Sequence, residues 1–429
     1  MKHWLYVFLI SSILSSCVKG KPDFVYSHRP IVFVHGFLAS GDTYEKQAKR
    51  FASNGYPLDR LYAFDWNSLG SANNELLLDK FIDSIRILTG AETIDLVGHS
   101  AGSGLVYSYS ASSLTRAKKI EHLVLLAGTA QSQAGGPNGE LPTLNIYSTA
   151  DLIATGGADI PDADNIRLTD KDHYQVATCE ETFEAMYSLF NTWQAPSTTD
   201  ITPDANIVLS GKAASFGENI ARAGTQVEIY SLDATTGFRL NATPDETFTT
   251  NALGNWGPFT AQANTYYEFV VSNPGVIGDR TIHYYREPFT RSDKLVYLRS
   301  YPTGASIAAL FLASLPKNDN QSVTAFFGAS QAAIAGRDDL KINGTTLSTN
   351  TFCDAANTTI ALFAYDVNNN STSDETAIAA FSLFPFLNGA DMFFPTVSPQ
   401  SVTFEFNGRV QKTRNWKSNT EGVSVAVFE

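Results

Sequence analysis

A serine between two glycines, where an apolar strand pattern becomes a helix pattern, constrains this chain more than any other feature. Residues 97–104 read VGHSAGSG and follow the apolar run TIDLV (93–97). A sharp strand-to-helix turn exposes a nucleophilic hydroxyl, and side chains two residues before and after it would collide. Gly98 and Gly102 stand at those two positions, so the pattern predicts that Ser100 is an exposed nucleophile. The alternative is an ordinary glycine-rich turn in which Ser100 only caps the helix.

The segment around this turn alternates apolar runs with helix-like stretches. Continuous apolar strands separated by helices predict an α/β fold, with a mostly parallel sheet covered on both faces. The expected strands are 30–36, 60–66, 93–98, 122–128 and 144–148, and the expected helices are 43–55, 74–90, 100–112 and 180–190. The polar sequence PDADN (161–165) is expected to be a surface turn.

The residue pattern changes at the sequence APSTT (195–199). Beyond it, short β-rich runs are separated by turn residues. Such spacing is typical of all-β, sandwich-like domains, and His283 is the only one of the seven histidines in this half. We therefore expect a catalytic α/β domain over residues 18–196. A small β-sandwich domain over 197–275 and a C-terminal β domain over 276–429 are expected to follow it.

A base and an acid for Ser100 can be sought among the remaining titratable residues. His173 lies in a loop before the last helix of the first half, from which it could reach the carboxyl end of the sheet. Asp151 directly follows a strand, which produces the chain order serine, acid, histidine. The alternatives are a solvent-exposed loop histidine and one of several nearby aspartates: Asp159, Asp162, Asp164, Asp170 and Asp172.

A tetrahedral oxyanion needs backbone N–H donors, and two positions suit that role. Ala101 follows the nucleophile, and Phe37 follows the His35-Gly36 pair at the end of the first strand, in the sequence FVHGF (33–37). His35 is expected to fix the loop rather than to act as a base.

The N-terminus predicts export from the cytoplasm. One lysine precedes an apolar run from Trp4 to Leu14, which is too short to span a bilayer and suits a secretory signal. The sequence LSSC (14–17) resembles a bacterial lipobox, so residues 1–17 are expected to be a signal peptide, with Cys17 as the lipidated residue of a membrane-anchored lipoprotein. The alternative is an ordinary secretory peptide with an incidental cysteine. Cys179 and Cys353 are expected to be buried free thiols.

Charge and composition argue against several other classes of protein. The net charge is −13 and no run of basic residues occurs, so nucleic acid is not an expected partner. The segment DVNNNSTSDETA (366–377) begins like a calcium loop but lacks its turn glycine and its final glutamate, which favours a polar turn. We expect no metal and no cofactor.

At this point the motifs resemble those of the α/β-hydrolase lipases. The stretches GDTYEKQAKRFASNGYP (41–57) and DHYQVATCEETFEAMYSLFN (172–191), with an all-β second half, are similar to archaeal and bacterial two-domain lipases. The resemblance implies a triad of Ser100, Asp151 and His173, oxyanion donors at Phe37 and Ala101, and a β region that meets a lipid interface or outer-membrane surface. Thr129–Pro142 is a candidate cover for such a site.

The expected function is hydrolysis of carboxylic esters, most simply acylglycerols, through an acyl-enzyme intermediate. Two alternatives stay open. The same triad could serve a polyester depolymerase or an acyltransferase, and the α/β domain could instead be a degenerate scaffold in a surface-binding lipoprotein.

Overall fold

The computed structural model describes residues 28–429, apart from 274–275, 277–278 and 303–305. The expected signal segment and Cys17 lie outside the described residues. In the part of the chain that is described, no helix is both long and apolar enough to cross a bilayer.

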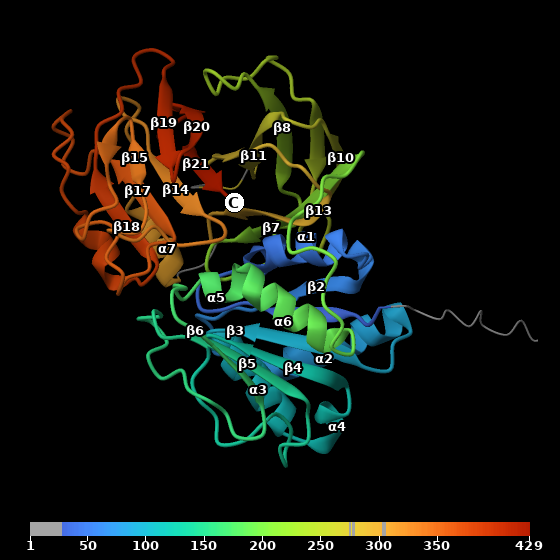
Figure 1. The fold of residues 1–429 in the computed structure, drawn as a ribbon. Coiled ribbons are helices and arrows are strands. Elements are labelled where there is room, and N and C mark those ends of the chain that lie inside the picture. Colours follow the sequence, from blue (N-terminus) through green and yellow to red (C-terminus); the bar gives the residue numbers. More distant parts are fainter. Residues whose placement is uncertain (1–27, 274–275, 277–278, 303–305) are drawn as a thin grey trace, which may run out of the picture.

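The first half of the chain forms one six-stranded sheet in the order β2-β1-β3-β4-β5-β6, with every neighbouring pair parallel. This sheet and its helices confirm the predicted α/β class (Figure 1). The strands are β1 (Ile31–Val34), β2 (Leu61–Phe64), β3 (Ile94–His99), β4 (Ile120–Leu126), β5 (Thr143–Ser148) and β6 (Asp164–Leu168).

Helices cover both faces of this sheet, which explains why its central strands read as continuous apolar runs. Successive side chains of a strand point to opposite faces. Ile31 and Phe33 of β1 accordingly join the core under α1 and α6, whereas Val32 and Val34 join the core under α2 and α3. The helical elements are η1 (Gly41–Tyr44), α1 (Glu45–Ser53), η2 (Leu58–Arg60), α2 (Asn74–Thr89), α3 (Ala101–Ala111), α4 (Leu114–Ala117), α5 (Gln175–Thr178) and α6 (Glu180–Phe190).

Strand β6 corrects one expectation from the sequence. Its first two residues, Asp164 and Asn165, belong to the stretch expected to be a surface turn, yet they pair in parallel with Leu144 and Asn145. No residue of β6 is fully buried. A polar edge strand held by backbone pairing carries no apolar run, which is why the pattern of the sequence missed it.

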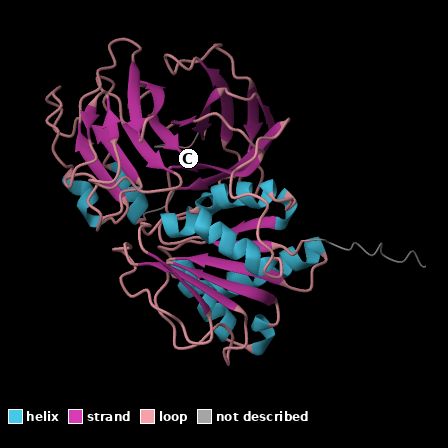
Figure 2. Ribbon diagram, in the orientation of Figure 1, coloured by secondary structure: helices cyan, strands magenta, loops and turns pink. Residues whose placement is uncertain are grey.

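The second half consists mostly of strands, as Figure 2 shows, which confirms the expected β-rich region. These strands form three sheets, of which two are mixed and the four-stranded one is wholly antiparallel. Their orders are β10-β7-β13, β18-β17-β14-β21-β12-β11-β8-β9 and β16-β15-β19-β20. The elements are β7 (Ile207–Ser215), β8 (Gln226–Leu232), β9 (Glu246–Thr249), β10 (Asn255–Ala261), β11 (Tyr266–Ser272), β12 (Ile282–Arg286), β13 (Asp293–Ser300), α7 (Ile307–Ala313), β14 (Thr324–Gly328), β15 (Leu340–Ile342), β16 (Thr345–Thr346), β17 (Ala361–Tyr365), η3 (Ala379–Leu383), β18 (Leu387–Asp391), β19 (Ser401–Phe406), β20 (Arg409–Arg414) and β21 (Val423–Phe428).

The eight-stranded sheet has an apolar core on each face. Phe269 and Phe363 belong to the core shared with β7 and β13, and Phe326 and Phe404 belong to the core shared with the four-stranded sheet. The boundary expected near residue 275 stays a prediction. Strands β11 and β12 on either side of it are hydrogen-bonded neighbours in this sheet.

The β region and the α/β half share a core and a buried charge cluster. Leu295 and Tyr297 of β13 pack in the same apolar cluster as Phe33 and Phe51. Beside this contact Lys49 of α1 reaches three carboxylates: Glu45 at 3.3 Å, Asp293 at 3.4 Å and Glu429.

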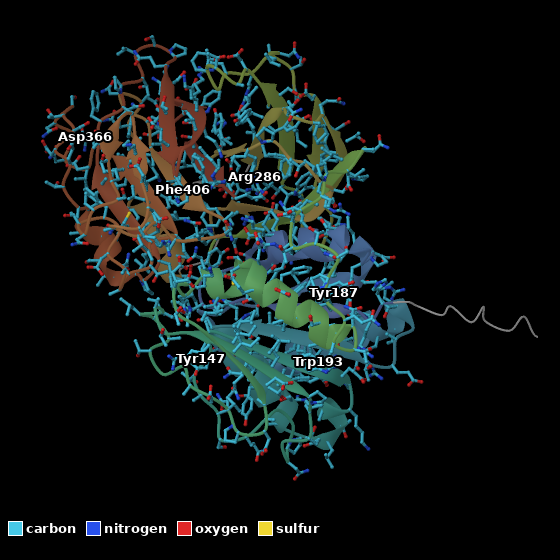
Figure 3. The ribbon with its side chains drawn as sticks, in the orientation of Figure 1. Tyr147, Tyr187, Trp193, Arg286, Asp366 and Phe406 are labelled. Atoms are coloured by element: carbon cyan, nitrogen blue, oxygen red, sulfur yellow. The ribbon has the colours of Figure 1, made fainter. Side chains whose placement is uncertain are left out.

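Arg286 of β12, labelled in Figure 3, completes this cluster by pairing with Glu45 and Glu429. Burial raises the pKa of Glu45 and of Glu429, although the neighbouring cations oppose that shift. Burial alone would lower the pKa of Lys49, but its three carboxylate partners raise it well above its ordinary value. Two cations thus face three carboxylates in a largely buried cluster, where breaking one pair leaves a charge uncompensated.

Replacing Lys49 with methionine should destabilise the protein because it leaves buried carboxylates without a partner. We expect the free energy of unfolding, measured in urea at pH 8, to fall by about 3–5 kcal/mol. Without the ammonium the folded-state pKa values of Glu45 and Glu429 would rise further, so the loss should shrink as the pH falls through those values. Lys80→Met on the exposed face of α2 is the matched control, with an expected change below about 0.5 kcal/mol. An equal change in both variants would contradict this account of the cluster.

Candidate active site

Ser100 lies on the turn between β3 and α3, in a backbone conformation that few residues other than glycine adopt. Its φ is 55° and its ψ is −122°. A Cβ on Gly98 would lie 2.5 Å from the carbonyl oxygen of Gly102, and a Cβ on Gly102 would lie 2.4 Å from that of His35. Neither distance is possible for a real side chain, so both glycines are required for the chain to make this turn.

The structure brings the three expected triad residues together. The Nε2 atom of His173 is 2.8 Å from Ser100 Oγ, and its Nδ1 atom is 2.7 Å from Asp151 Oδ2. Asp151 follows β5, and its Oδ1 atom accepts hydrogen bonds from the backbone N–H groups of Ile153 and Ala154. Among the described contacts, none of the five rival aspartates bonds the His173 ring: Asp159, Asp162, Asp164, Asp170 and Asp172.

The hydrogen bonds around Asp151 keep its carboxyl group charged. Burial alone would raise its pKa, but the bond from His173 and those from the two backbone N–H groups lower the pKa below its ordinary value. A carboxylate at this place holds the Nδ1–H tautomer of the imidazole, which leaves the Nε2 lone pair directed at the serine.

His99 is a second histidine at the site, whose role the sequence did not reveal. It directly precedes Ser100, is 3% exposed, and its Nε2 atom is 2.9 Å from the backbone oxygen of His173. Burial and the neighbouring His173 lower the pKa of His99 to about 3, so its ring is neutral and Nε2–H donates this bond. The two imidazole rings lie 4.9 Å apart, and His99 thus supports the loop that carries His173.

The two expected oxyanion donors flank the serine. Ala101 is the first residue of α3, where a backbone N–H has no partner within the helix. Phe37 follows Gly36, on which a Cβ would lie only 3.0 Å from Ser100 Cβ, so this loop lies directly against the nucleophile. His35 is buried below the loop, as expected: its Nδ1 atom bonds the Gly36 oxygen at 2.8 Å, and burial lowers its pKa to about 4.

An apolar cavity lies between this site and the β region. Phe37 and Tyr174 come from the catalytic side, and the ring of Phe386 from the β region stacks on His173 with centroids 5.8 Å apart. Arg299, a charged group on the wall, is neutralised by Asp42 at 2.6 Å. The cavity residues contributed by the β region are Phe216, Ile282, Tyr284, Arg299, Tyr301, Leu312, Leu315, Ala325, Phe326, Phe327, Ile360, Ala361, Phe363, Pro385, Phe386, Leu387, Val423, Ser424 and Val425.

The candidate cover Thr129–Pro142 contributes no residue to this cavity among the described residues. The loop instead packs beside β5 and α3: the Gly135 amide bonds Thr143 Oγ1, and the Gly136 amide bonds Ser110 Oγ. The β region itself therefore provides the covering wall, which the sequence could not show because its residues follow Ser100 by over a hundred positions.

Cys179 and Cys353 are both free thiols, as expected. Cys353 is buried, which raises its pKa to about 12, whereas Cys179 is only half-buried, which corrects the expectation that both would be buried. Within the described ranges, Glu45, Asp293 and Glu429 are the carboxylates close enough to share a metal ion, but the Lys49 ammonium already lies among them.

Comparisons with known families match three successive parts of the chain. Residues 28–110, which include the Ser100 turn, match the family model described as Lipase (class 2). Residues 205–302 match a Lipase C-terminal domain, and residues 326–429 match a further model described as a C-terminal domain.

Among individual proteins, the abhydrolase domain-containing protein abhd-5.2 of Caenorhabditis elegans is 33% identical over 126 residues, which cover 27% of each chain. The chain thus spans about a quarter of the length of that relative. Among solved structures, lipase B of Aspergillus fumigatus is 13% identical with a TM-score of 0.32, covering 40% of this chain and 54% of that one. Bacillus licheniformis lipase BlEst2 is 17% identical with a TM-score of 0.32, covering 38% of this chain and 92% of that one. The class 2 lipase match over the Ser100 turn and the lipase C-terminal match behind it make the chain similar to the α/β-hydrolase lipases in two successive parts of its length.

Proposed function

We propose that this protein hydrolyses carboxylic esters through a covalent acyl-enzyme formed on Ser100. The hydrogen-bonded chain from Ser100 through His173 to Asp151, at 2.8 and 2.7 Å, is the observation that carries the proposal. These are the separations at which a base can take a proton from a nucleophile while a carboxylate stabilises the resulting imidazolium.

In the first half of the reaction, Ser100 Oγ attacks the ester carbonyl carbon while His173 Nε2 takes the hydroxyl proton. The oxyanion of the tetrahedral intermediate lies against the backbone N–H groups of Phe37 and Ala101. The C–O bond to the alcohol then breaks, and His173 returns its proton to the leaving alkoxide. In the second half, His173 takes a proton from water, which attacks the acyl-serine carbonyl. The bond from the acyl carbon to Ser100 Oγ then breaks, His173 returns its proton to Ser100 Oγ, and the carboxylic acid leaves.

The cavity supports an ester with an extended apolar acyl group. Its wall is built from aliphatic and aromatic side chains, its one guanidinium is neutralised, and it meets the site at Phe37 and Phe386. Each methylene of a bound chain would gain about 0.8 kcal/mol from leaving water, which favours long acyl chains such as those of acylglycerols.

Replacing Ser100 with alanine should remove catalysis without unfolding the protein. We expect kcat for p-nitrophenyl esters to fall by at least about 10⁴-fold, since no other group can take over the covalent step. The matched control is Ser108→Ala on the exposed face of α3, which should retain wild-type turnover. Full activity in Ser100→Ala would contradict the mechanism, and absence of serine-dependent turnover in the wild type would favour the scaffold alternative.

Filling the cavity should change chain-length preference. Val425 of β21 lines the cavity and is only half-buried, so tryptophan there would occupy the space for the acyl chain. We expect Val425→Trp to lower kcat/KM for dodecanoyl and hexadecanoyl esters by about 10-fold or more, the equivalent of ~1.4 kcal/mol of lost binding. Acetyl and butanoyl esters should be hydrolysed within about twofold of wild type. A uniform loss across all chain lengths would place the acyl group elsewhere.

We also propose that the protein acts outside the cytoplasm, anchored through a lipidated Cys17. The support is the N-terminal sequence alone: an apolar run of signal-peptide length followed by LSSC (14–17). Several acyl chains on one cysteine would hold the protein firmly at a membrane surface. In cells, Cys17→Ser should move the protein from the detergent phase to the aqueous phase of a Triton X-114 partition. Unchanged partition would favour the ordinary secretory alternative.

A further inference from the structure

Both loops that carry catalytic groups rest on polar side chains from the β region. One loop, residues 35–40, holds the oxyanion donor Phe37, and the other, residues 171–174, holds His173. Asn219 bonds the first loop through neutral hydrogen bonds. In the second loop, Asp172 is bonded by the charged Arg337 and by the backbone N–H of Ala332 at 3.3 Å.

Asn219 lies in the turn after β7 and reaches beneath the oxyanion loop. Its φ is 56°, a left-handed conformation that asparagine tolerates, and it is 6% exposed. Its side-chain oxygen accepts a hydrogen bond of 2.6 Å from Ser40 Oγ. Its Nδ2 atom lies 2.7 Å from the oxygen of Ala39 and 3.1 Å from that of Trp66.

The same Nδ2 atom is 3.1 Å from Nε2 of His35, so Asn219 touches both ends of the segment that contains Phe37. His35 Nδ1–H donates to the Gly36 oxygen, which leaves Nε2 to accept from Asn219 and from the Trp66 amide at 3.2 Å. The segment between these ends has no regular secondary structure, and Leu38 within it has a φ of 58°. Its shape is therefore set by side-chain bonds, of which those from Asn219 come from outside the α/β half.

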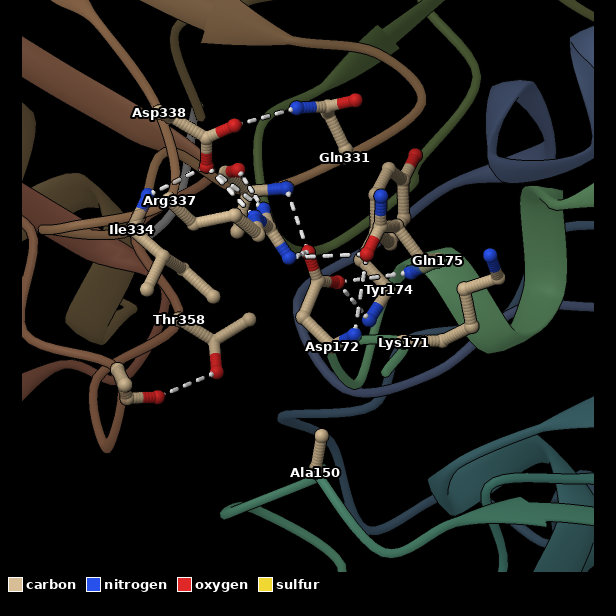
Figure 4. Close-up of polar contacts among 12 residues, drawn as sticks. Ala150, Lys171, Asp172, Tyr174, Gln175, Gln331, Ile334, Arg337, Asp338 and Thr358 are labelled. Atoms are coloured by element: carbon tan, nitrogen blue, oxygen red, sulfur yellow. Dashed lines mark hydrogen bonds and ion pairs between the residues drawn. The ribbon is translucent and has the colours of Figure 1, made fainter. Parts of the chain in front are cut away.

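Arg337 holds the second loop through Asp172, the residue before His173. As Figure 4 shows, the guanidinium of Arg337 reaches from the β region to the Asp172 carboxylate at 2.8 Å and to Gln175 Oε1 at 2.9 Å. Asp172 Oδ1 accepts the backbone N–H groups of Tyr174 and Gln175, each at 2.8 Å. Asp172 precedes His173 and binds the backbone that follows it, and Arg337 supplies the charge that this buried carboxylate needs.

We propose that Asn219 and Arg337 are positioning residues, so that the β region is an integral part of the catalytic machinery and not only a binding accessory. This rests on the proposed ester hydrolysis at Ser100. Neither residue touches the substrate: Asn219 fixes the Phe37 amide for the oxyanion, and Arg337 fixes His173 for the nucleophile. A displacement of about 1 Å in either group is enough to cost about 100-fold in rate.

The test compares kcat and KM for p-nitrophenyl butanoate in full-length variants. Asn219→Ala should lower kcat by about 10- to 100-fold while KM stays within about twofold, because an oxyanion donor acts in the transition state and not in substrate binding. Asn219→Asp has the same shape and keeps the acceptor for Ser40 but loses the donors, so the same loss is expected. This variant decides the question if the alanine variant does not fold.

For the second loop, Arg337→Met should lower kcat by about 10-fold or more, and Arg337→Lys should recover most of it because it keeps a cation beside Asp172. Arg291→Met is the matched control. It removes another bond from the β region to the α/β half, 2.7 Å to the Ala52 oxygen, away from both loops, and should leave kcat within about twofold.

The outcomes separate the two proposals. Absence of serine-dependent turnover in the wild type overturns the proposed function itself. With an active wild type, Asn219→Asp at wild-type kcat, or a change confined to KM, overturns the positioning role of Asn219. Equal losses in Arg337→Met, Arg337→Lys and Arg291→Met would show only a general weakening of the contact between the two halves, and would overturn the role of Arg337.

Discussion

The turn at Ser100 is the constraint on which the rest of this structure depends. A residue other than glycine keeps a backbone φ of 55° only where the surroundings leave no other conformation. Here the surroundings are backbone: the carbonyls of Gly102 and His35 lie where a Cβ of Gly98 or Gly102 would have to be. The same close approach brings the 35–40 loop against Ser100. The tight packing that exposes Ser100 therefore also places the loop that contains Phe37 beside it.

The two halves of the chain are joined by continuous packing and not by a flexible linker alone. Tyr297 of β13 belongs to the core beneath α1, and Lys49 and Arg286 share carboxylates contributed by both halves. A rigid junction of this kind allows residues such as Phe386 to form the wall of a cavity whose reacting end lies in the other half. The arrangement explains how a small α/β half with a short connection between β2 and α2 can have an apolar cavity beside its candidate site.

The sequence predicted those elements that have strong local patterns. The apolar central strands, the amphipathic helices and the Ser100 turn are all encoded within a few residues, and the structure contains each of them. The structure also brings Asp151 and His173 to the serine, two residues selected by their positions after a strand and before the last helix of that half. The sequence did not predict strand β6 or the role of His99, because a polar edge strand and a histidine next to Ser100 have no distinctive pattern.

The sequence by itself determined the α/β class, the β-rich second half and the strained turn that carries Ser100, because hydrophobic period, turn chemistry and glycine spacing are local properties. Only the tertiary structure decided what surrounds Ser100. Asn219 lies 180 residues from Ala39, whose oxygen it binds, and Arg337 lies 162 residues from Gln175. Contacts at such separations arise from how sheets and helices pack, and no pattern within one segment records them.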